Sequence, residues 1–435
     1  MGKTTFDLAV IGLGYIGLPT AATFASHGKK VAGVDVKQST VDAVNRGEVP
    51  FVEPDLGVVV SGTVSLGSLK AFTEVPQADA FIIAVPTPVA EDKDVDLSYL
   101  RSAAEMIAPV LRGGELVILE STSPPGTTER IGEFLVAARP DLCLLPEPGK
   151  RQIHLAHSPE RVLPGRIMIE IVTNDRVVGG LTPEASRMAK ELYEVICQGE
   201  IHVTDAKTAE MTKLAENSFR DLNIAFANQL ALMCGQLGVD VWRLIELANR
   251  HPRVDILKPG PGVGGHCIAV DPWFLVSAFP NHSGLARAAR ELNDSMPGHV
   301  VDRALAAVAD VPAPTIALLG LAFKANVDDT RESPAMDVVR LLADAAPGAT
   351  LLAVDPHVPA LPQALAGAGN IGLAELDTAL EAADLVVLLV DHDEFKALDQ
   401  DRLLGRRIID TRGVWRPADG ADGSLAAAAV PSLAL

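Results

Sequence analysis

The sequence predicts an α/β protein in which two Rossmann-like, doubly wound domains are joined by a central helical domain with a long connecting helix. Two stretches show a strand, a glycine turn, a helix and a second strand that ends in an acidic residue, one at the N-terminus and one after residue 313. Hydrophobic residues make up 48% of the chain but aromatic residues only 4%, which is typical of aliphatic α/β layers. For 435 residues we expect domains at 1–200, 201–305 and 306–420, followed by a tail at 421–435.

The N-terminal unit carries a dinucleotide-binding fingerprint. FDLAVIG predicts a buried strand, GLGYIGLPTAATFASHG a glycine turn that opens a helix, and KVAGVD a second strand that ends in Asp35. The turn lets a pyrophosphate approach the backbone, while Asp35 binds the ribose hydroxyls and repels a 2′-phosphate. NAD is therefore the expected cofactor, with contacts to Gly12, Gly14, Tyr15, Ile16, Gly17 and Asp35. The alternative is a glycine-rich turn with a surface aspartate.

Two further predicted strands end in polar residues. ADAFIIAVPTP at 78–88 places Thr87 near the carboxyl end of its strand, and GELVILESTSPPGT at 114–127 places Glu120, Ser121 and Thr122 there. Ligands of open parallel sheets collect at this edge, so we expect these side chains to face the nicotinamide crevice. Taken singly, each serine or threonine is equally an ordinary loop cap.

Residues 205 to about 237 predict an unusually long helix, because they lack proline throughout and glycine until Gly235. One stripe of this helix is apolar, which predicts a packing seam and a subunit interface; it consists of Leu222, Phe226, Leu230, Met233 and Leu237. Lys213 and Asn217 share another face, where a cation and an amide would form an oxyanion or hydroxyl site. The alternative places Lys213 on a solvated face.

GPGVGGHCIAVDPW at 260–273 can be neither helix nor strand in its glycine-rich part, and it ends in a thiol, Cys267. Such a loop lets a ligand approach the main chain, although a tight turn before a strand IAV is the alternative. The other cysteines, Cys143, Cys197 and Cys234, lie in apolar or helical contexts and suggest structural roles. No C-x-x-C pair or zinc spacing occurs, so neither a disulfide framework nor a metal site is expected.

The C-terminal unit repeats the N-terminal pattern but lacks G-x-G-x-x-G. Its first loop instead carries Lys324 and Arg331, its second strand ends in Asp355, and ADLVVLLVDHDEF at 383–395 echoes ADAFIIAVPTP. Lysine and arginine there would suit the diphosphate of a pyrimidine nucleotide. The final residues are low in complexity and predict a loose tail.

Several long motifs together resemble the UDP-glucose/GDP-mannose 6-dehydrogenase family of nucleotide-sugar dehydrogenases. They are AVPTP, ESTSPPGT, HSPERVLPG, AEMTKLAENSFRD, NRHPRVDILKPGPGVGGHCIAVDPWF and GLAFKANVDDTRESPAMD, and the resemblance extends from residue 10 to residue 395. It implies NAD-dependent four-electron oxidation of the C6 alcohol of a sugar nucleotide through a cysteine thiohemiacetal and thioester. It also assigns NAD binding to the first domain, dimerisation and the cysteine loop to the second, and UDP-sugar binding to the third.

ENSFRDLNIAFAN, NRHPRV and GGHCIAVDPWF are most similar to the branch that acts on UDP-N-acetyl-D-mannosamine for surface polysaccharide synthesis. UDP-glucose and UDP-N-acetylglucosamine are the alternative substrates within the family. A two-electron dehydrogenase of the β-hydroxyacid type is a second alternative, but it needs neither Cys267 nor a second nucleotide domain. A non-catalytic nucleotide sensor would be expected to lack some of the catalytic groups.

The resemblance also carries roles onto single residues. It assigns catalysis to Cys267 as nucleophile, Asp271 as the adjoining acid, Lys213 and Asn217 as ligands of the reacting oxygen, and Glu160 as acid/base. Further substrate contacts are assigned to Arg161, Val162, Leu163, Gly264 and Lys324, and to Arg253 across a homodimer interface. The resemblance assigns one more NAD contact, at the pyrophosphate, to Arg331, beside the contacts that we expect for Thr87 and Thr122 from their place at the strand ends.

The formal net charge of −19 argues against a nucleic-acid partner, because duplex binding requires a basic face. The sequence has no apolar run long enough for a membrane helix, and MGKTTFDLAVIG shows no signal-peptide pattern. We therefore expect a cytoplasmic enzyme without a membrane partner.

Overall fold

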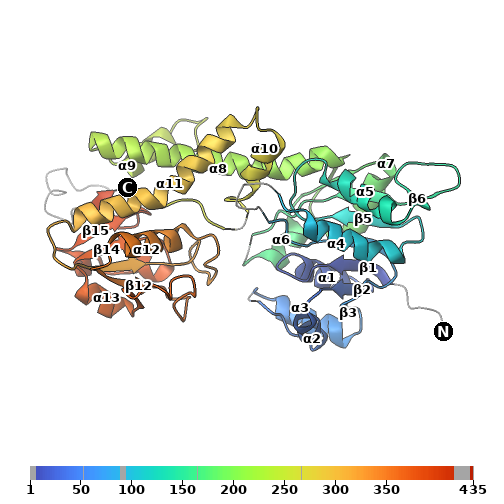
Figure 1. The fold of residues 1–435 in the computed structure, drawn as a ribbon, viewed down its shortest axis with the longest axis horizontal. Coiled ribbons are helices and arrows are strands. Elements are labelled where there is room, and N and C mark those ends of the chain that lie inside the picture. Colours follow the sequence, from blue (N-terminus) through green and yellow to red (C-terminus); the bar gives the residue numbers. More distant parts are fainter. Residues whose placement is uncertain are drawn as a thin grey trace. The chain divides into compact units, whose positions relative to one another are not determined.

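The computed structural model describes residues 6–51, 53–88, 95–163, 165–265, 267–415 and 432–434. The chain divides into two compact units, Met1–Glu216 with Trp273–Phe279, and Asn217–Pro272 with Pro280–Leu435. Each unit contains a sheet flanked by helices (Figure 1). The α/β class and the two doubly wound sheets agree with the sequence prediction.

The sheet of the first unit has the order β10-β9-β8-β5-β4-β1-β2-β3 and is parallel except between β8 and β9. Its strands are β1 (Phe6–Ile11), β2 (Val31–Val34), β3 (Leu69–Phe72), β4 (Ala78–Ile83), β5 (Leu116–Leu119), β8 (His154–His157), β9 (Arg176–Gly180) and β10 (Ile201–Asp205). A separate two-stranded sheet pairs β6 (Leu142–Cys143) with β7 (Arg151–Gln152). The strand β10 thus extends the first sheet five residues beyond the boundary that we predict at residue 200.

Alternate side chains of β1 enter two different cores, as expected for a strand covered on both faces. Leu8 and Val10 pack with α1, α2, α3 and α7, whereas Ala9 and Ile11 pack with α4 and α5. The helices of this unit are α1 (Gly17–Ser26), α2 (Gln38–Asn45), α3 (Leu56–Ser65), α4 (Ser98–Ile107), α5 (Thr127–Ala138), α6 (Ile167–Thr173) and α7 (Pro183–Tyr193).

In the second unit the sheet order is β13-β12-β11-β14-β15-β16, and every pair is parallel. Its strands are β11 (Thr315–Leu319), β12 (Thr350–Val354), β13 (Ile371–Leu373), β14 (Leu385–Leu388), β15 (Arg407–Asp410) and β16 (Ser432–Ala434). The last strand differs from the loose tail predicted by composition, because the free edge of β15 provides backbone partners for it. The rest of the predicted tail lies outside the described residues.

The long helix α8 (Ala206–Leu237) begins in the first unit and ends in the second, and it confirms the predicted connecting helix. Ala227, Ala231 and Cys234 on this helix belong to the core of the second unit. The remaining helices are α9 (Val241–Ala248), α10 (Asp271–Ala278), α11 (Gly284–Ala307), α12 (Pro334–Ala345), α13 (Leu376–Ala382) and α14 (Asp393–Lys396). Among the residues described, no helix is both long enough and apolar enough to cross a membrane.

Candidate active site

The three glycines of the fingerprint have different physical roles in the first unit. Gly12 has φ +96°, and a Cβ there would lie 2.6 Å from the carbonyl oxygen of Ala84. A Cβ on Gly17 would lie 1.8 Å from the carbonyl oxygen of Gly12, so this glycine allows α1 to pack against the turn. No atom lies within 4 Å of a Cβ built on Gly14, which leaves room for a ligand at that position. The turn therefore fits a bound pyrophosphate.

Asp35, at the carboxyl end of β2, is held by the turn that it faces. Its Oδ2 accepts a hydrogen bond from the backbone N–H of Leu13 at 3.0 Å, and its Oδ1 accepts one from Lys37 at 2.9 Å. Both oxygens retain lone pairs for ribose hydroxyls. Next to this site, Tyr15 stacks on Phe51 with ring centroids 4.3 Å apart, and Ile16 is the residue before the first turn of α1.

The second unit has an acid at the equivalent position, Asp355, but the space beside this acid is occupied. Asp355 accepts hydrogen bonds from the N–H of Leu321 at 2.7 Å and of His357 at 2.9 Å, as Asp35 does from its own loop. Here, however, Nε2 of the fully buried His392 lies 3.2 Å from Oδ2 of Asp355. The imidazole thus occupies a lone pair that a ribose hydroxyl would need, which agrees with the missing glycine fingerprint in this domain.

His357, His392 and Glu394 also present ligand atoms within 4.8 Å of one another. Nδ1 of His392 accepts the N–H of Asn326 at 3.0 Å, and its Nε2 contacts Asp355. Both ring nitrogens of His392 therefore have protein partners, whereas the buried Nε2 of His357 has no hydrogen-bond partner among the described residues.

At the carboxyl ends of β4 and β5, two of the predicted NAD contacts meet. The Thr87 hydroxyl donates to the carbonyl oxygen of Thr122 at 2.6 Å, and the Ser121 hydroxyl donates to that of Val85 at 2.6 Å. The location of the Glu120 side chain differs from our prediction, because it does not face the crevice. The residue is only 1% exposed, and its carboxylate is bonded to side chains in the interior of the unit.

Glu160 lies in the segment after β8, and both of its oxygens are engaged. Oε1 accepts the N–H of Arg161 at 2.7 Å, and Oε2 accepts from Nη2 of the buried Arg176 at 3.0 Å. The guanidinium of Arg161 is bonded to Glu216 at 2.7 Å and to the carbonyl oxygen of Asp175 at 3.1 Å. The Arg161 guanidinium is thus already paired, and the carbonyl oxygen of Arg161 also accepts a hydrogen bond, from Nδ2 of Asn174 at 3.1 Å.

The outer part of that loop is more open. Val162 is partly exposed, and Leu163 is exposed and donates its N–H to Glu170 at 2.8 Å. Together with Glu160 and Arg161 they form one continuous segment of the first unit.

The helix α8 carries Lys213 and Asn217 one turn apart, as predicted. Three residues before Lys213, the buried Glu210 accepts hydrogen bonds from the N–H of Gly126 at 2.6 Å and of Thr128 at 2.7 Å. N–H groups at the start of a helix such as α5 have no partner within that helix, so the Glu210 side chain, which comes from α8, caps α5. It ties the helix that bears Lys213 to the loop that bears Thr122.

The cysteine loop belongs to the second unit. Gly262 has φ +136° and Gly265 φ +87°, and a Cβ on Gly264 would lie 2.5 Å from the carbonyl oxygen of Glu332. The loop therefore packs closely against residues 323–334 of the C-terminal domain, and it ends in the exposed Cys267. Residues 267–270 form a turn that leads into α10, so the alternative of a strand IAV is wrong.

Asp271 begins α10 and is 3% exposed. Nδ2 of Asn217 donates a hydrogen bond to its Oδ2. The structure thus brings two of the predicted catalytic side chains, those of Asn217 and Asp271, into contact within the second unit. Asp271 lies four residues after the thiol-bearing Cys267.

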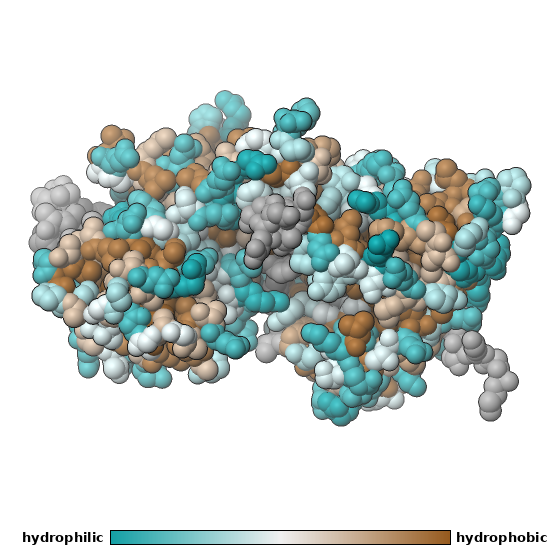
Figure 2. Space-filling view, in the orientation of Figure 1, coloured by the Kyte–Doolittle hydropathy of each residue, from teal (hydrophilic) through white to brown (hydrophobic). Residues whose placement is uncertain are grey.

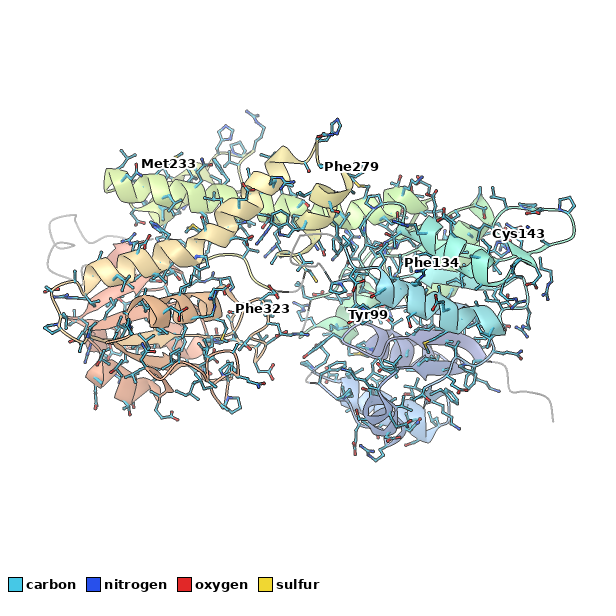
Figure 3. The ribbon with its side chains drawn as sticks, viewed as in Figure 1. Tyr99, Phe134, Cys143, Met233, Phe279 and Phe323 are labelled. Atoms are coloured by element: carbon cyan, nitrogen blue, oxygen red, sulfur yellow. The ribbon has the colours of Figure 1, made fainter. Side chains whose placement is uncertain are left out.

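A hollow lies beside the loop, and Lys324 and Arg412 contribute positive charge to it. Its other lining includes Gly262, Phe323 and Val390; Figure 3 shows Phe323 in the loop after β11. Arg412 is paired with Asp391 at 3.0 Å and was not predicted from the sequence. The available signal was its place directly after β15, where ligands of such sheets collect.

Two predicted arginines are exposed in the second unit. Arg331 forms an ion pair with Asp329 of its own loop at 2.7 Å, and Arg253 lies in the segment after α9. Their assigned contacts to NAD and to a neighbouring subunit stay predictions.

Three consecutive segments match the UDP-glucose/GDP-mannose dehydrogenase family. Residues 6–197 match its NAD binding domain, 207–295 its central domain and 317–417 its UDP binding domain. The chain is 55% identical over 418 residues to a UDP-N-acetyl-D-mannosamine dehydrogenase of Salmonella typhi, covering 94% of this chain and 99% of that protein. It is 54% identical over 409 residues to an NDP-N-acetyl-D-galactosaminuronic acid dehydrogenase of Ralstonia nicotianae, covering 94% and 96%.

Among solved structures, a UDP-D-ManNAc dehydrogenase from Pyrococcus horikoshii superposes with a TM-score of 0.84 at 40% identity, covering 95% of this chain and 97% of that one. The fold, the NAD-binding fingerprint and the matches along three segments all lead to one conclusion. As its sequence motifs predict, the chain belongs to the UDP-glucose/GDP-mannose dehydrogenase family of NAD-binding oxidoreductases.

Proposed function

We propose that this enzyme oxidises the C6 alcohol of UDP-N-acetyl-D-mannosamine to the carboxylate, for use in surface polysaccharide synthesis. The observation that carries this proposal is the exposed thiol of Cys267, which ends a glycine loop packed against the UDP binding domain. The relatives named for this activity share more than half of their residues with the chain over nearly its whole length.

A thiol is needed because the oxidation removes four electrons. When bound, NAD accepts one hydride at a time, so two NAD molecules serve one sugar. Cys267 adds to the aldehyde carbon to form a thiohemiacetal, and oxidation of this adduct leaves a thioester. Water then bonds to the acyl carbon as the carbon–sulfur bond breaks. In total, one alcohol, one water and two NAD yield one carboxylate, two NADH and three protons.

The assigned roles follow from the charge that develops in each step. Lys213 and Asn217 bind the C6 oxygen, where alkoxide and oxyanion character appear. Asp271, bonded to Asn217, holds that amide in orientation and supplies an acid four residues after the thiol-bearing Cys267. Glu160 takes the proton of the attacking water, while the backbone N–H of Arg161 and the guanidinium of Arg176 fix its carboxylate.

Binding of the two nucleotides is divided between the domains. The Gly12–Gly17 turn, together with Arg331, would hold the pyrophosphate of NAD, Asp35 would hold its adenosine ribose, and Thr87 and Thr122 would hold its nicotinamide end. Lys324 and Arg412 line a hollow suited to a pyrimidine diphosphate. The segment Arg161–Leu163 and Gly264 complete the substrate site.

We further propose a homodimer formed through α8, with Arg253 reaching the substrate of the neighbouring subunit. Phe226 and Met233 of the predicted stripe are 49% and 50% exposed, whereas Leu230 packs against the core of the second unit. Phe219, seven residues before Phe226, is 69% exposed. Apolar side chains are visible over α8 and α9 in Figure 2, and Figure 3 labels Met233 on α8. A second copy would cover these three exposed side chains. We place the enzyme in the cytoplasm, where NAD and a reduced thiol are both available.

A second candidate substrate is the N-acetyl-D-galactosamine counterpart, because relatives named NDP-N-acetyl-D-galactosaminuronic acid dehydrogenase are equally similar. The test is kcat/KM for UDP-N-acetylmannosamine, UDP-N-acetylgalactosamine, UDP-N-acetylglucosamine and UDP-glucose. We expect the mannosamine sugar to exceed the others by at least about tenfold, a difference of about 1.4 kcal/mol in transition-state binding. A higher value for another sugar would keep the chemistry and change the substrate.

A further inference from the structure

A buried ion cluster stands behind Glu160 in the first unit. Arg176 donates from Nη2 to Oε2 of Glu160 at 3.0 Å, and its Nη1 lies 3.4 Å from Oε1 of Glu120. The side chains of Arg176, Glu120 and Glu160 are 5%, 0% and 9% exposed. Glu120 also accepts hydrogen bonds from the Tyr193 hydroxyl at 3.0 Å and from the Thr20 hydroxyl at 3.2 Å. One guanidinium thus bridges two carboxylates inside the protein.

The sheet topology explains why an arginine is buried at this edge. Glu120 directly follows β5, and Glu160 lies three residues after β8, so both acids are at the carboxyl edge of the parallel strands. β9 runs antiparallel to β8, which brings its first residue, Arg176, to the same edge. The guanidinium also lies over the ring of Tyr193 on α7, with 4.4 Å to the ring centroid.

The cluster holds two acids and one cation, so it cannot neutralise both carboxylates at once. Burial raises the pKa of Glu120 to about 7, and the negative charge of Glu160 acts in the same direction. The pKa of Tyr193 is raised well above its ordinary value, first by burial and then by Glu120, so its hydroxyl keeps its proton and donates it. The titratable groups facing Glu120 are therefore Glu160, Arg176 and Tyr193, while α1 contributes only the uncharged Thr20.

We propose that Glu120 is a positioning residue that acts on Glu160 through Arg176, by competing for the shared guanidinium. When Glu120 is ionised, Arg176 divides its charge between two carboxylates, and Glu160 is a stronger base toward the hydrolytic water. When Glu120 takes up a proton from solvent, Arg176 pairs with Glu160 alone and Glu160 is a weaker base. This inference rests on the proposed role of Glu160 in thioester hydrolysis.

The test compares wild type with Glu120→Gln, using the pH dependence of kcat and intact-protein mass spectrometry of the adduct on Cys267 during turnover. In the wild type, hydrolysis should accelerate with an inflection near pH 7, where Glu120 ionises. Glu120→Gln keeps the shape but has no second charge, so this inflection should disappear. Above neutral pH its hydrolysis should be about tenfold slower, and the acyl adduct on Cys267 should accumulate.

Glu115→Gln is the matched control. Glu115 precedes the same strand β5, is 3% exposed, and accepts hydrogen bonds from the N–H groups of Arg112 and Gly113. It should leave the inflection in place. If Glu120→Gln fails to fold, Tyr193→Phe provides a second test. Loss of the donated hydrogen bond disfavours the ionised form of Glu120, so the inflection should move to higher pH.

An inflection that persists in Glu120→Gln, with no increase in the acyl adduct, would overturn the role of Glu120. The wild type separates this failure from failure of the proposed function. If wild type forms no acyl adduct and yields one NADH per sugar, the thioester chemistry itself is wrong. If it yields two NADH and Glu120→Gln retains the wild-type profile, only the present inference is lost.

Discussion

Lys213 is the residue whose proposed role differs most from its appearance in the sequence, where a lysine on a helix is ordinarily solvated. We predict that Lys213→Ala lowers kcat by about two to three orders of magnitude, because a preorganised cation at a developing oxyanion contributes about 3 to 4 kcal/mol. The dissociation constant of NAD should stay within about twofold of wild type.

Lys207→Ala is the control for this variant. Lys207 lies on the same helix, is exposed, and pairs with Glu129 at 3.0 Å. Its removal should change kcat by less than about twofold, since an exposed ion pair contributes little. Equal activity of the two variants would contradict the catalytic role of Lys213 and would favour the alternative that it lies on a solvated helix face.

His157, at the end of β8, should make the protein sensitive to acid. Burial lowers its pKa from 6.5 to about 3, so the folded protein resists a proton that the unfolded chain accepts. The free energy of unfolding therefore falls as pH decreases from about 6.5 toward about 3. His157→Gln should remove this slope, which is about 2 kcal/mol between neutral pH and about pH 5.

The measurement is urea unfolding of wild type and His157→Gln at matched pH values. Glu120 contributes the opposite slope, because its raised pKa favours the folded state below about 7 and loses that advantage as pH rises through this value. Taking the difference between the two proteins at each pH cancels this contribution. Parallel stability curves for the two proteins would contradict the assignment to His157.

Among the elements, the segment before the cysteine loop is held to α8 and α9 by asparagine side chains. Asn223 accepts the N–H of Leu257 at 2.9 Å, Asn249 accepts that of Ile256 at 2.8 Å, and Asn228 accepts that of Gly260 at 2.9 Å. The side-chain oxygens of these amides thus accept backbone N–H groups of the segment, as the carbonyl oxygens of a neighbouring strand would.

Asn228 is the innermost of the three. It is fully buried, and its Nδ2 donates to Oδ1 of Asn293 at 2.9 Å. Asn293 in turn donates to Asp221, which also accepts from the buried Arg290 at 2.6 Å. A polar network thus connects α8 and α11 to the base of the loop that carries the thiol.

We predict that Asn228→Ala lowers the free energy of unfolding by about 2 kcal/mol, because it leaves the buried N–H of Gly260 unpaired. It should also lower kcat more than it changes NAD affinity, since the thiol loop loses its anchor while the NAD fingerprint is untouched. Chemical denaturation and NAD titration give the two values. Loss of NAD affinity equal to the loss of kcat would show general unfolding instead.

The elements themselves were largely accessible from sequence, because each depends on local patterns. Glycine and proline delimit the first βα turn and the cysteine loop, and their absence predicts α8. The buried networks were not accessible. Asn228 and Gly260 are 32 positions apart and Glu120 and Arg176 are 56 apart, and neither pairing leaves a periodic signal. For that reason the prediction that Glu120 faces the crevice is wrong, and the sequence does not indicate the roles of Asn228, Arg176 and Arg412.

For the whole molecule, the internal repeat in the sequence predicts the architecture correctly. Both sheets place their first strand beside their second and fourth, and both end that second strand in an acid that binds the first loop. The two nucleotide sites differ in a tertiary contact, because Asp355 is hydrogen-bonded to His392, a residue 37 positions away in the sequence. Sequence alone showed the lost glycines but not the side chain that takes up the space.

The apolar stripe on α8 predicts the oligomeric state. We expect the wild type to be a dimer by multi-angle light scattering, and Phe226→Glu with Met233→Glu to yield monomers, because a buried charge opposes association. Leu66→Glu is the control, since Leu66 is 84% exposed at the end of α3. A dimer that survives the double substitution would place the interface elsewhere.

In the proposed mechanism, one sugar is oxidised twice on one thiol. The most direct measurement is the end-point yield of NADH per UDP-N-acetylmannosamine consumed, with wild type and Cys267→Ser in parallel. We expect two NADH per sugar for the wild type, and for Cys267→Ser a stall after the first oxidation or a trapped ester. One NADH per sugar in the wild type, or full conversion to the acid by Cys267→Ser, would contradict it.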